Sequence, residues 1–149
     1  MLYSLRLQKG VIMKSVFHLA FNVTDLDEAR NFYGELLGCQ EGRSTDSWVD
    51  FSFFNHQISL HLGEPFKVEK TGKVGEHFVP MPHLGVLLDM KTWVALATKL
   101  KESKIKFLIE PTVRFKGEAG EQHTMFFYDP FGNPIEIKAF ANFDTIYKS

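Results

Sequence analysis

The sequence predicts an α+β domain made of two copies of one β-α-β-β-β unit. Two apolar, strand-like segments carry a histidine at corresponding positions, His18 and His83. Each segment is followed by apolar residues at helical spacing, and then by three more strand-like segments. A repeat of this size indicates two modules that pack together, because neither module alone can cover both its helix and its sheet.

The first module is expected at residues 14–63. Residues 15–23 predict a buried strand that contains His18. Thr24 is the expected N-cap of the following helix, and Asp27 stands where a capping box places an acid. The strands that follow are expected at residues 39–43, 48–54 and 57–62. The helix is predicted from apolar residues at helical spacing and from a glycine that ends it: Ala29, Phe32, Tyr33, Leu36, Leu37 and Gly38.

The second module is expected at residues 82–140, after a linker at residues 64–81 that is rich in proline, glycine and charge. A strand at residues 83–88 precedes a helix that begins at Asp89 or Met90. Strands within residues 104–115, 122–128 and 133–140 follow. The inward face of the helix is predicted to consist of Trp93, Leu96, Ala97 and Leu100. Residues 1–13 are an expected N-terminal extension, and residues 141–149 are an expected C-terminal tail.

Composition excludes several classes of partner. The chain has 149 residues, a net charge of −1 and one cysteine. This charge gives no reason to expect a nucleic acid or an anionic membrane as partner. No apolar run approaches the roughly 20 residues of a membrane span, and a single cysteine suits the reducing cytoplasm. Fifteen phenylalanines indicate an aromatic core or an aromatic-lined cavity.

The stretch at residues 129–140 begins as a turn and becomes a strand. Pro130 and Gly132 are typical turn residues, and alternation then places Ile135 and Ile137 on one face and Glu136 on the other. Alone, Glu136 could be a solvated strand residue, and His18 or His83 a satisfied core histidine. Together, two histidines and one carboxylate are the ligand set of a facial-triad metal site.

Four segments of the chain resemble the vicinal oxygen chelate superfamily. They are residues 17–26 (FHLAFNVTDL), residues 29–38, residues 82–86 (PHLGV) and residues 129–136 (DPFGNPIE). This superfamily includes glyoxalase I, extradiol dioxygenases, fosfomycin-resistance thiol transferases and bleomycin-binding proteins. The resemblance spans about Lys14 to Phe140. Residues 55–62 and 117–122 are most similar to the small, single-domain proteins grouped with extradiol dioxygenases.

The resemblance implies two βαβββ modules whose sheets curl into a cup around one divalent metal ion. Its ligands would be His18, His83 and Glu136, on the first strands of the two modules and the last strand of the second. Glyoxalase I has a further carboxylate on the last strand of the first module, where this chain has Ser59 or His61. The set therefore resembles the extradiol dioxygenase centre. Fe(II) is the favoured ion, and Mn(II), Ni(II) and Zn(II) suit the same ligands.

Two residues are candidates for catalysis. His61 is expected on the same strand face as the position that matches Glu136, where the resemblance implies an acid–base histidine. A fourth metal ligand or an exposed polar residue are the alternatives. The active-site tyrosine of the family falls near Phe126, and Tyr128 lies two residues further on the same face. Tyr128 can equally be a core aromatic residue.

Three residues are candidates for substrate binding. Arg114 can hold a substrate carboxylate through two hydrogen bonds, or it can form a surface salt bridge. Gln122 and Thr124 share one face of the strand that would form a wall of the cup, and Glu121 and His123 share the other. The pattern does not decide which pair faces inward.

The resemblance implies a metal-dependent enzyme that binds a small substrate through two adjacent oxygens. The expected reaction is ring-opening dioxygenation of a catechol-like substrate. Alternatives are a lyase, isomerase or thiol transferase with nickel, manganese or zinc, and a non-enzymatic protein that sequesters a drug or metabolite. A homodimer is expected by analogy with the family.

Overall fold

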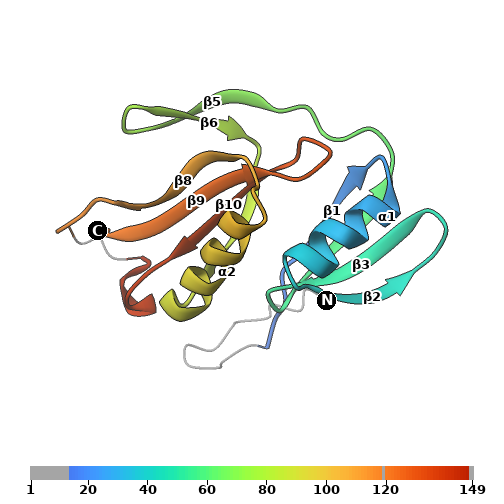
Figure 1. Ribbon diagram of the computed structural model, residues 1–149, viewed down its shortest axis with the longest axis horizontal. Coiled ribbons are helices and arrows are strands. Elements are labelled where there is room, and N and C mark those ends of the chain that lie inside the picture. The colour runs from blue at the N-terminus through green and yellow to red at the C-terminus, as the bar shows by residue number, and fades with distance from the viewer. Residues whose placement is uncertain (1–13, 119, 148–149) are drawn as a thin grey trace, which may run out of the picture.

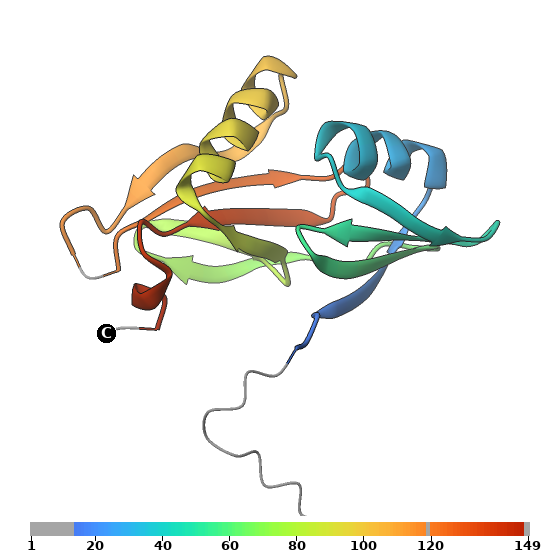
Figure 2. The ribbon, with the colours of Figure 1, turned by 90° about the horizontal axis from the view of Figure 1, so that it is seen from below.

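A computed structural model describes residues 14–118 and 120–147, so the expected extension at residues 1–13 lies outside the described residues. Two four-stranded sheets lie side by side, and the helices of both modules cover the same side of them (Figures 1 and 2). Each module runs strand, helix, strand, strand, strand. The predicted α+β architecture of two βαβββ modules is therefore confirmed.

The first sheet has the strand order β1-β4-β3-β2, with β1 parallel to β4 and the other pairs antiparallel. Ile58 and Leu60 of β4 are buried in the core, so the alternate residues Gln57, Ser59 and His61 point to the opposite face. The elements of the module are β1 (His18–Val23), α1 (Leu26–Ala29), η1 (Arg30–Leu36), β2 (Gln40–Ser44), β3 (Trp48–Phe53) and β4 (His56–Leu62).

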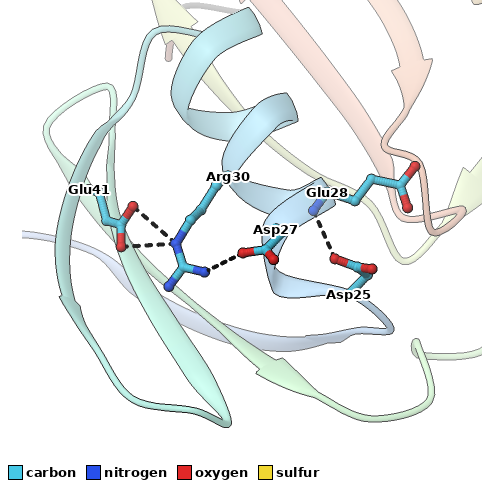
Figure 3. Close-up of polar contacts among 5 residues, drawn as sticks. All are labelled: Asp25, Asp27, Glu28, Arg30 and Glu41. Carbon is cyan, nitrogen blue, oxygen red and sulfur yellow. Dashed lines mark hydrogen bonds and ion pairs between the residues drawn. The ribbon is translucent and has the colours of Figure 1, made fainter.

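The first helix begins one residue later than the sequence predicts. Asp25, not Thr24, is the N-cap, because its extended backbone lets its carboxylate accept a hydrogen bond of 2.9 Å from the backbone N–H of Glu28 (Figure 3). Arg30 then bridges the helix to β2 by ion pairs with Asp27 and Glu41. From Arg30 the helix continues as the π-helix η1, and Gly38 ends it with φ +74°.

The second sheet has the order β7-β10-β9-β8, with β7 parallel to β10. Asp89 caps α2 through the N–H of Thr92, and the predicted inward face of α2 is buried. None of the described helices is both long and apolar enough to cross a membrane. The elements of this module are β7 (Leu84–Leu88), α2 (Met90–Glu102), β8 (Phe107–Arg114), β9 (Gln122–Tyr128) and β10 (Pro134–Ala139), and the short η2 (Phe143–Thr145) follows them.

The segment at residues 64–81 is not the irregular linker that its composition suggests. It contains an antiparallel hairpin of β5 (Glu69–Val74) and β6 (His77–Met81). The hairpin lies on the side of the second sheet opposite α2 (Figure 2). β5 is mostly exposed and rich in charge, and the two buried residues of β6, Val79 and Pro80, are adjacent, so neither strand shows the alternation that identifies a half-buried strand.

A buried polar contact joins the two modules. The hydroxyl of Tyr33 in η1 donates a hydrogen bond of 2.7 Å to the carboxylate of Asp129, at the turn before β10. Asn133 donates to Asp129 and to the backbone carbonyl of Asn22, at the end of β1. Phe32 packs near Phe127 in the core that the modules share. Much of the phenylalanine content therefore lies in this core.

Candidate metal centre

His83 and Glu136 lie together on the second sheet. Glu136 of β10 stands opposite Gly85 of β7, and His83 directly precedes β7. The Nε2 atom of His83 lies 3.3 Å from Oε2 of Glu136. Thr124 of β9 is buried and donates a hydrogen bond of 2.9 Å to Oε1 of the same carboxylate. The second carboxylate oxygen is therefore free of Thr124 and turned toward the imidazole.

The backbone fixes the tautomer of His83. Its Nδ1 atom lies 2.7 Å from the carbonyl oxygen of Pro80. Because a carbonyl oxygen only accepts hydrogen bonds, Nδ1 must carry the proton. In the neutral imidazole, Nε2 then has a free lone pair on the side of Glu136. Metal-binding histidines are commonly held in this way by a backbone carbonyl.

The environment of the pair favours its charged form. The hydrogen bond to Glu136 outweighs burial and raises the pKa of His83 above 6.5. Burial alone would raise the pKa of Glu136, but the His83 hydrogen bond and the charge of Lys138 outweigh it and hold that pKa below 4.5. The Nζ atom of Lys138 lies 3.9 Å from Oε2. Glu136 is thus a carboxylate at neutral pH.

Gly85 lets β7 and β10 come close at this point. A Cβ atom at position 85 would collide with the backbone carbonyl of Glu136. Only glycine avoids that collision, so the close approach of the two strands depends on it. Gly85 therefore helps to set the distance between the segment that carries His83 and the strand that carries Glu136.

His18 lies on the other sheet, at the start of β1, where its side chain is exposed. Its Nδ1 atom is 2.7 Å from Oε1 of Gln57 on β4. In the part of the chain that the structure describes, no three His, Cys, Asp or Glu side chains come together in a way that could hold a metal ion. The structure thus brings His83, Glu136 and Thr124 together within the chain, but not His18.

His61 lies on the face of the first sheet that is turned away from the core. Its ring stacks on Trp48 of β3, with centroids 6.2 Å apart, and it stands opposite Asn22 in the strand register. It lines a cavity of about 440 Å³ whose other walls are Ala20, Phe21, Asn22, Glu64 and Phe66. His61 and His18 therefore share one sheet and neither joins Glu136 within the chain.

The other candidate residues lie on β8 and β9. Cross-strand pairing of Thr124 with Lys138 puts Gln122 and Thr124 on the face that carries Glu136. Oε1 of Gln122 is buried and has no hydrogen-bond partner among the described residues. Tyr128, at the end of β9, is half-buried. Arg114 donates a hydrogen bond of 3.1 Å to the carbonyl oxygen of Val74, so it ties β8 to the hairpin.

Sequence reasoning missed Asp50, a buried carboxylate on β3. Its exposed fraction is 6%. Asp50 stands opposite Ser59 in the strand register and accepts a hydrogen bond from the Ser59 hydroxyl. Ser59 occupies the position in the first module that corresponds to Glu136 in the second. The signal was present in residues 48–53, where Val49, Phe51 and Phe53 alternate with polar or amphipathic residues. An acid between core residues of a central strand is a functional candidate because burial of an unpaired charge is unfavourable.

The donor set fits a divalent cation. His18 and His83 both have an oxygen acceptor at Nδ1, which leaves Nε2 as the ligand atom. Thr124 orients the Glu136 carboxylate through Oε1. Supporting hydrogen bonds of this kind are typical of metal ligands. Neutral imidazole and carboxylate suit first-row transition metals without choosing among them.

The sequence profile of the Glyoxalase/Bleomycin resistance protein/Dioxygenase superfamily matches residues 15–137. The chain belongs to this superfamily. Members of the superfamily typically bind a divalent metal ion. A comparison with curated proteins gave no match.

Solved structures of the superfamily share the fold. A glyoxalase/bleomycin resistance protein/dioxygenase from Alicyclobacillus acidocaldarius has 30% identity and a TM-score of 0.73, over 89% of this chain and 96% of the other. A glyoxalase/dioxygenase from Nostoc punctiforme has 26% identity and a TM-score of 0.60, over 85% and 90%. The fosfomycin resistance protein FosX from Listeria monocytogenes has 15% identity and a TM-score of 0.65, over 91% and 99%. That last likeness concerns the fold alone.

Proposed function

We propose that the protein is a metal-dependent enzyme whose ion is held by His83 and Glu136 of one copy and by His18 of a second copy. The observation that carries the proposal is the common arrangement of the two histidines. Each has Nδ1 occupied by an oxygen acceptor, which leaves Nε2 as the nitrogen that can bind an ion. Oε2 of Glu136 lies beside one of these nitrogens. Two imidazoles and one carboxylate then complete a facial triad.

The two sheets lie side by side in one chain (Figure 1), and His18 is not grouped with His83 and Glu136 among the described residues. The third ligand would therefore come from the His18 of a second copy. Both β1 and β7 are sheet edges. Exposed apolar side chains favour association. Phe17, next to His18, is 64% exposed, and Phe78, on the hairpin beside the second sheet, is 59% exposed. A two-fold symmetric dimer would use both surfaces twice and form two identical sites.

The ion and the surrounding side chains would have different roles in the reaction. A divalent ion at this place would supply Lewis-acid stabilisation of negative charge on two adjacent substrate oxygens. His61, which would accompany His18 on the same sheet, is proposed to accept and return the substrate proton. Gln122 has an unpartnered buried oxygen on the face of Glu136, and it is proposed to accept a hydrogen bond from the substrate. Thr124 keeps the Glu136 carboxylate in place.

Ring-opening dioxygenation of a catechol-like substrate with Fe(II) is the reaction that we propose within the superfamily. A ligand set of two histidines and one carboxylate leaves coordination positions open, which is typical of iron oxygenases. Arg114 and Tyr128 are secondary candidates. The hydrogen bond of Arg114 to Val74 indicates that Arg114 holds the hairpin near the sheet. Tyr128 is the last residue of β9, the strand that carries Gln122 and Thr124.

Metal content tests the proposal. Protein purified anaerobically without a histidine tag should hold about one equivalent of iron per chain by elemental analysis, since a symmetric dimer has one site per chain. Glu136→Ala and His18→Ala should both lose the metal, and neither should consume O₂ with catechols as the parent does. His77→Ala, which changes an exposed histidine on the hairpin, is the matched control and should keep the metal.

Two results would contradict the proposal. A protein that neither contains nor takes up a divalent ion would not be a metalloenzyme. A metal retained at full stoichiometry in Glu136→Ala would place the ion elsewhere.

A further inference from the structure

Asp50 is the one carboxylate buried within the first sheet among the residues that the structure describes. Its Oδ1 atom accepts a hydrogen bond from the hydroxyl of Ser59, and its Oδ2 atom accepts one of 3.3 Å from Nε2 of Gln57. Arg43, which is largely exposed, lies 4.0 Å from Oδ2. Each carboxylate oxygen of Asp50 therefore accepts from a different side chain, Oδ1 from Ser59 and Oδ2 from Gln57.

The carboxylate decides which way the amide of Gln57 points. An amide has a donating NH₂ end and an accepting oxygen end, and a carboxylate can only accept. The NH₂ group of Gln57 must therefore face Asp50. Its oxygen then faces the opposite direction, toward Nδ1 of His18 at 2.7 Å.

The amide in turn decides the tautomer of His18. Because Oε1 of Gln57 only accepts, the nitrogen beside it must donate, so Nδ1 of neutral His18 carries the proton. The lone pair then lies on Nε2, which points away from β4. His83 reaches the same tautomer by a different route, through the carbonyl oxygen of Pro80. His56 is in the opposite state, since its Nδ1 accepts a hydrogen bond from the backbone N–H of Phe17.

We propose that Asp50 and Gln57 are positioning residues that hold His18 as its Nδ1–H tautomer, so that Nε2 is presented as a metal ligand. The proposal rests on the ligand role of His18 in the proposed function. It adds a chain of hydrogen bonds that runs from a buried carboxylate on β3, through an amide on β4, to an exposed imidazole on β1. Asp50 thereby fixes the tautomer of His18 through Gln57, without contacting the imidazole itself.

The tautomers can be read directly from long-range ¹H–¹⁵N NMR spectra of metal-free protein, at a pH where the imidazoles are neutral. We expect the Nδ1–H form for His18 and His83 and the Nε2–H form for His56. Asp50→Ala removes the acceptor that fixes the Gln57 amide, so either end of the amide can face Nδ1 and His18 should become a mixture of tautomers. Gln57→Met, of similar length, should leave His18 as a mixture of tautomers.

His83 is the internal control, because its Nδ1 partner is a backbone carbonyl that neither substitution changes. It should keep its tautomer in both variants. The proposal is overturned by an Nε2–H form of His18 in the parent protein. It is equally overturned by a His18 tautomer that stays unchanged in Asp50→Ala or in Gln57→Met.

Zn²⁺ titration separates this proposal from the proposed function. Loss of a group that orients a metal ligand typically weakens metal affinity about 10- to 100-fold, and we expect a loss of that size in both variants. A mixture of His18 tautomers with unchanged Zn²⁺ affinity in these variants would support the hydrogen-bonded chain and contradict the ligand role of His18. If the His18 tautomer is unchanged in the Asp50 and Gln57 variants, but His18→Ala still loses Zn²⁺ binding, the ligand role of His18 would be supported and the hydrogen-bonded chain contradicted.

Discussion

At the scale of single residues, the buried carboxylate of Asp129 is surrounded by hydrogen-bond donors. Asp129 accepts hydrogen bonds from the Tyr33 hydroxyl, the Asn133 amide and the backbone N–H groups of Phe131 and Asn133. Burial nevertheless raises the pKa of Asp129 above 3.8, and these donors only moderate the rise. The contact between Tyr33 and Asp129 joins the two modules, so its loss should lower the stability of the whole domain.

Tyr33→Phe removes the hydroxyl and leaves the ring in the core. We expect a loss of about 2 kcal/mol in the free energy of unfolding, the usual range for a hydrogen bond to a charged group, measured by urea denaturation. Tyr147→Phe is the matched control, because Tyr147 is almost fully exposed, and it should not change stability. Equal stability of the parent and Tyr33→Phe would show that this contact does not hold the modules together.

The loss in Tyr33→Phe should depend on pH. Because the pKa of Asp129 is raised on folding, its contribution to stability is full below 3.8 and is lost as the pH rises through its folded value. Removal of a donor raises that folded value further. The destabilisation should therefore be largest at neutral pH, where Asp129 is charged, and smaller in acid, where it is protonated. A loss that grows in acid would contradict this assignment.

At the scale of elements, the pairing of β7 with β10 positions the His83–Glu136 pair. The sequence showed that a histidine and a carboxylate lie on these segments, because alternation and turn residues are local signals. It did not show that Gly85 permits their close approach, since that contact lies between residues distant in the chain. The hairpin of β5 and β6 was missed for a related reason: its strands carry no hydrophobic alternation.

Gly85→Ala would place a methyl group against the backbone carbonyl of Glu136. We expect a destabilisation of about 1–3 kcal/mol from this overpacking, together with weaker Zn²⁺ binding as β7 moves away from β10. Gly120→Ala is the control, because a Cβ there meets no atom of the described residues within 4 Å. Thermal unfolding and Zn²⁺ titration of the two variants test this prediction. Parental stability and Zn²⁺ affinity in Gly85→Ala would show that the two strands accommodate the methyl group.

At the scale of the whole molecule, the repeat in the sequence predicted both modules and their order of elements. Each module is a local unit with its own hydrophobic pattern, which a sequence displays. The relation between the modules depends on contacts such as Tyr33–Asp129 and Asn133–Asn22, which no local pattern encodes. For that reason the three candidate ligands and their modules could be named from the sequence, but it could not be predicted that His18 stays apart from His83 and Glu136 within one chain.

The central claim is that each metal site is shared between two copies. His18→Ala and Glu136→Ala chains with different, histidine-free tags should be co-expressed and their heterodimer isolated. One of its two sites would then combine the intact His18 of one chain with the intact His83 and Glu136 of the other, and the second site would lack both His18 and Glu136. We predict one Zn²⁺ bound with parental affinity per heterodimer, against two per parental dimer and none in either variant alone. A heterodimer without any such site, or a protein that stays monomeric, would contradict the shared site.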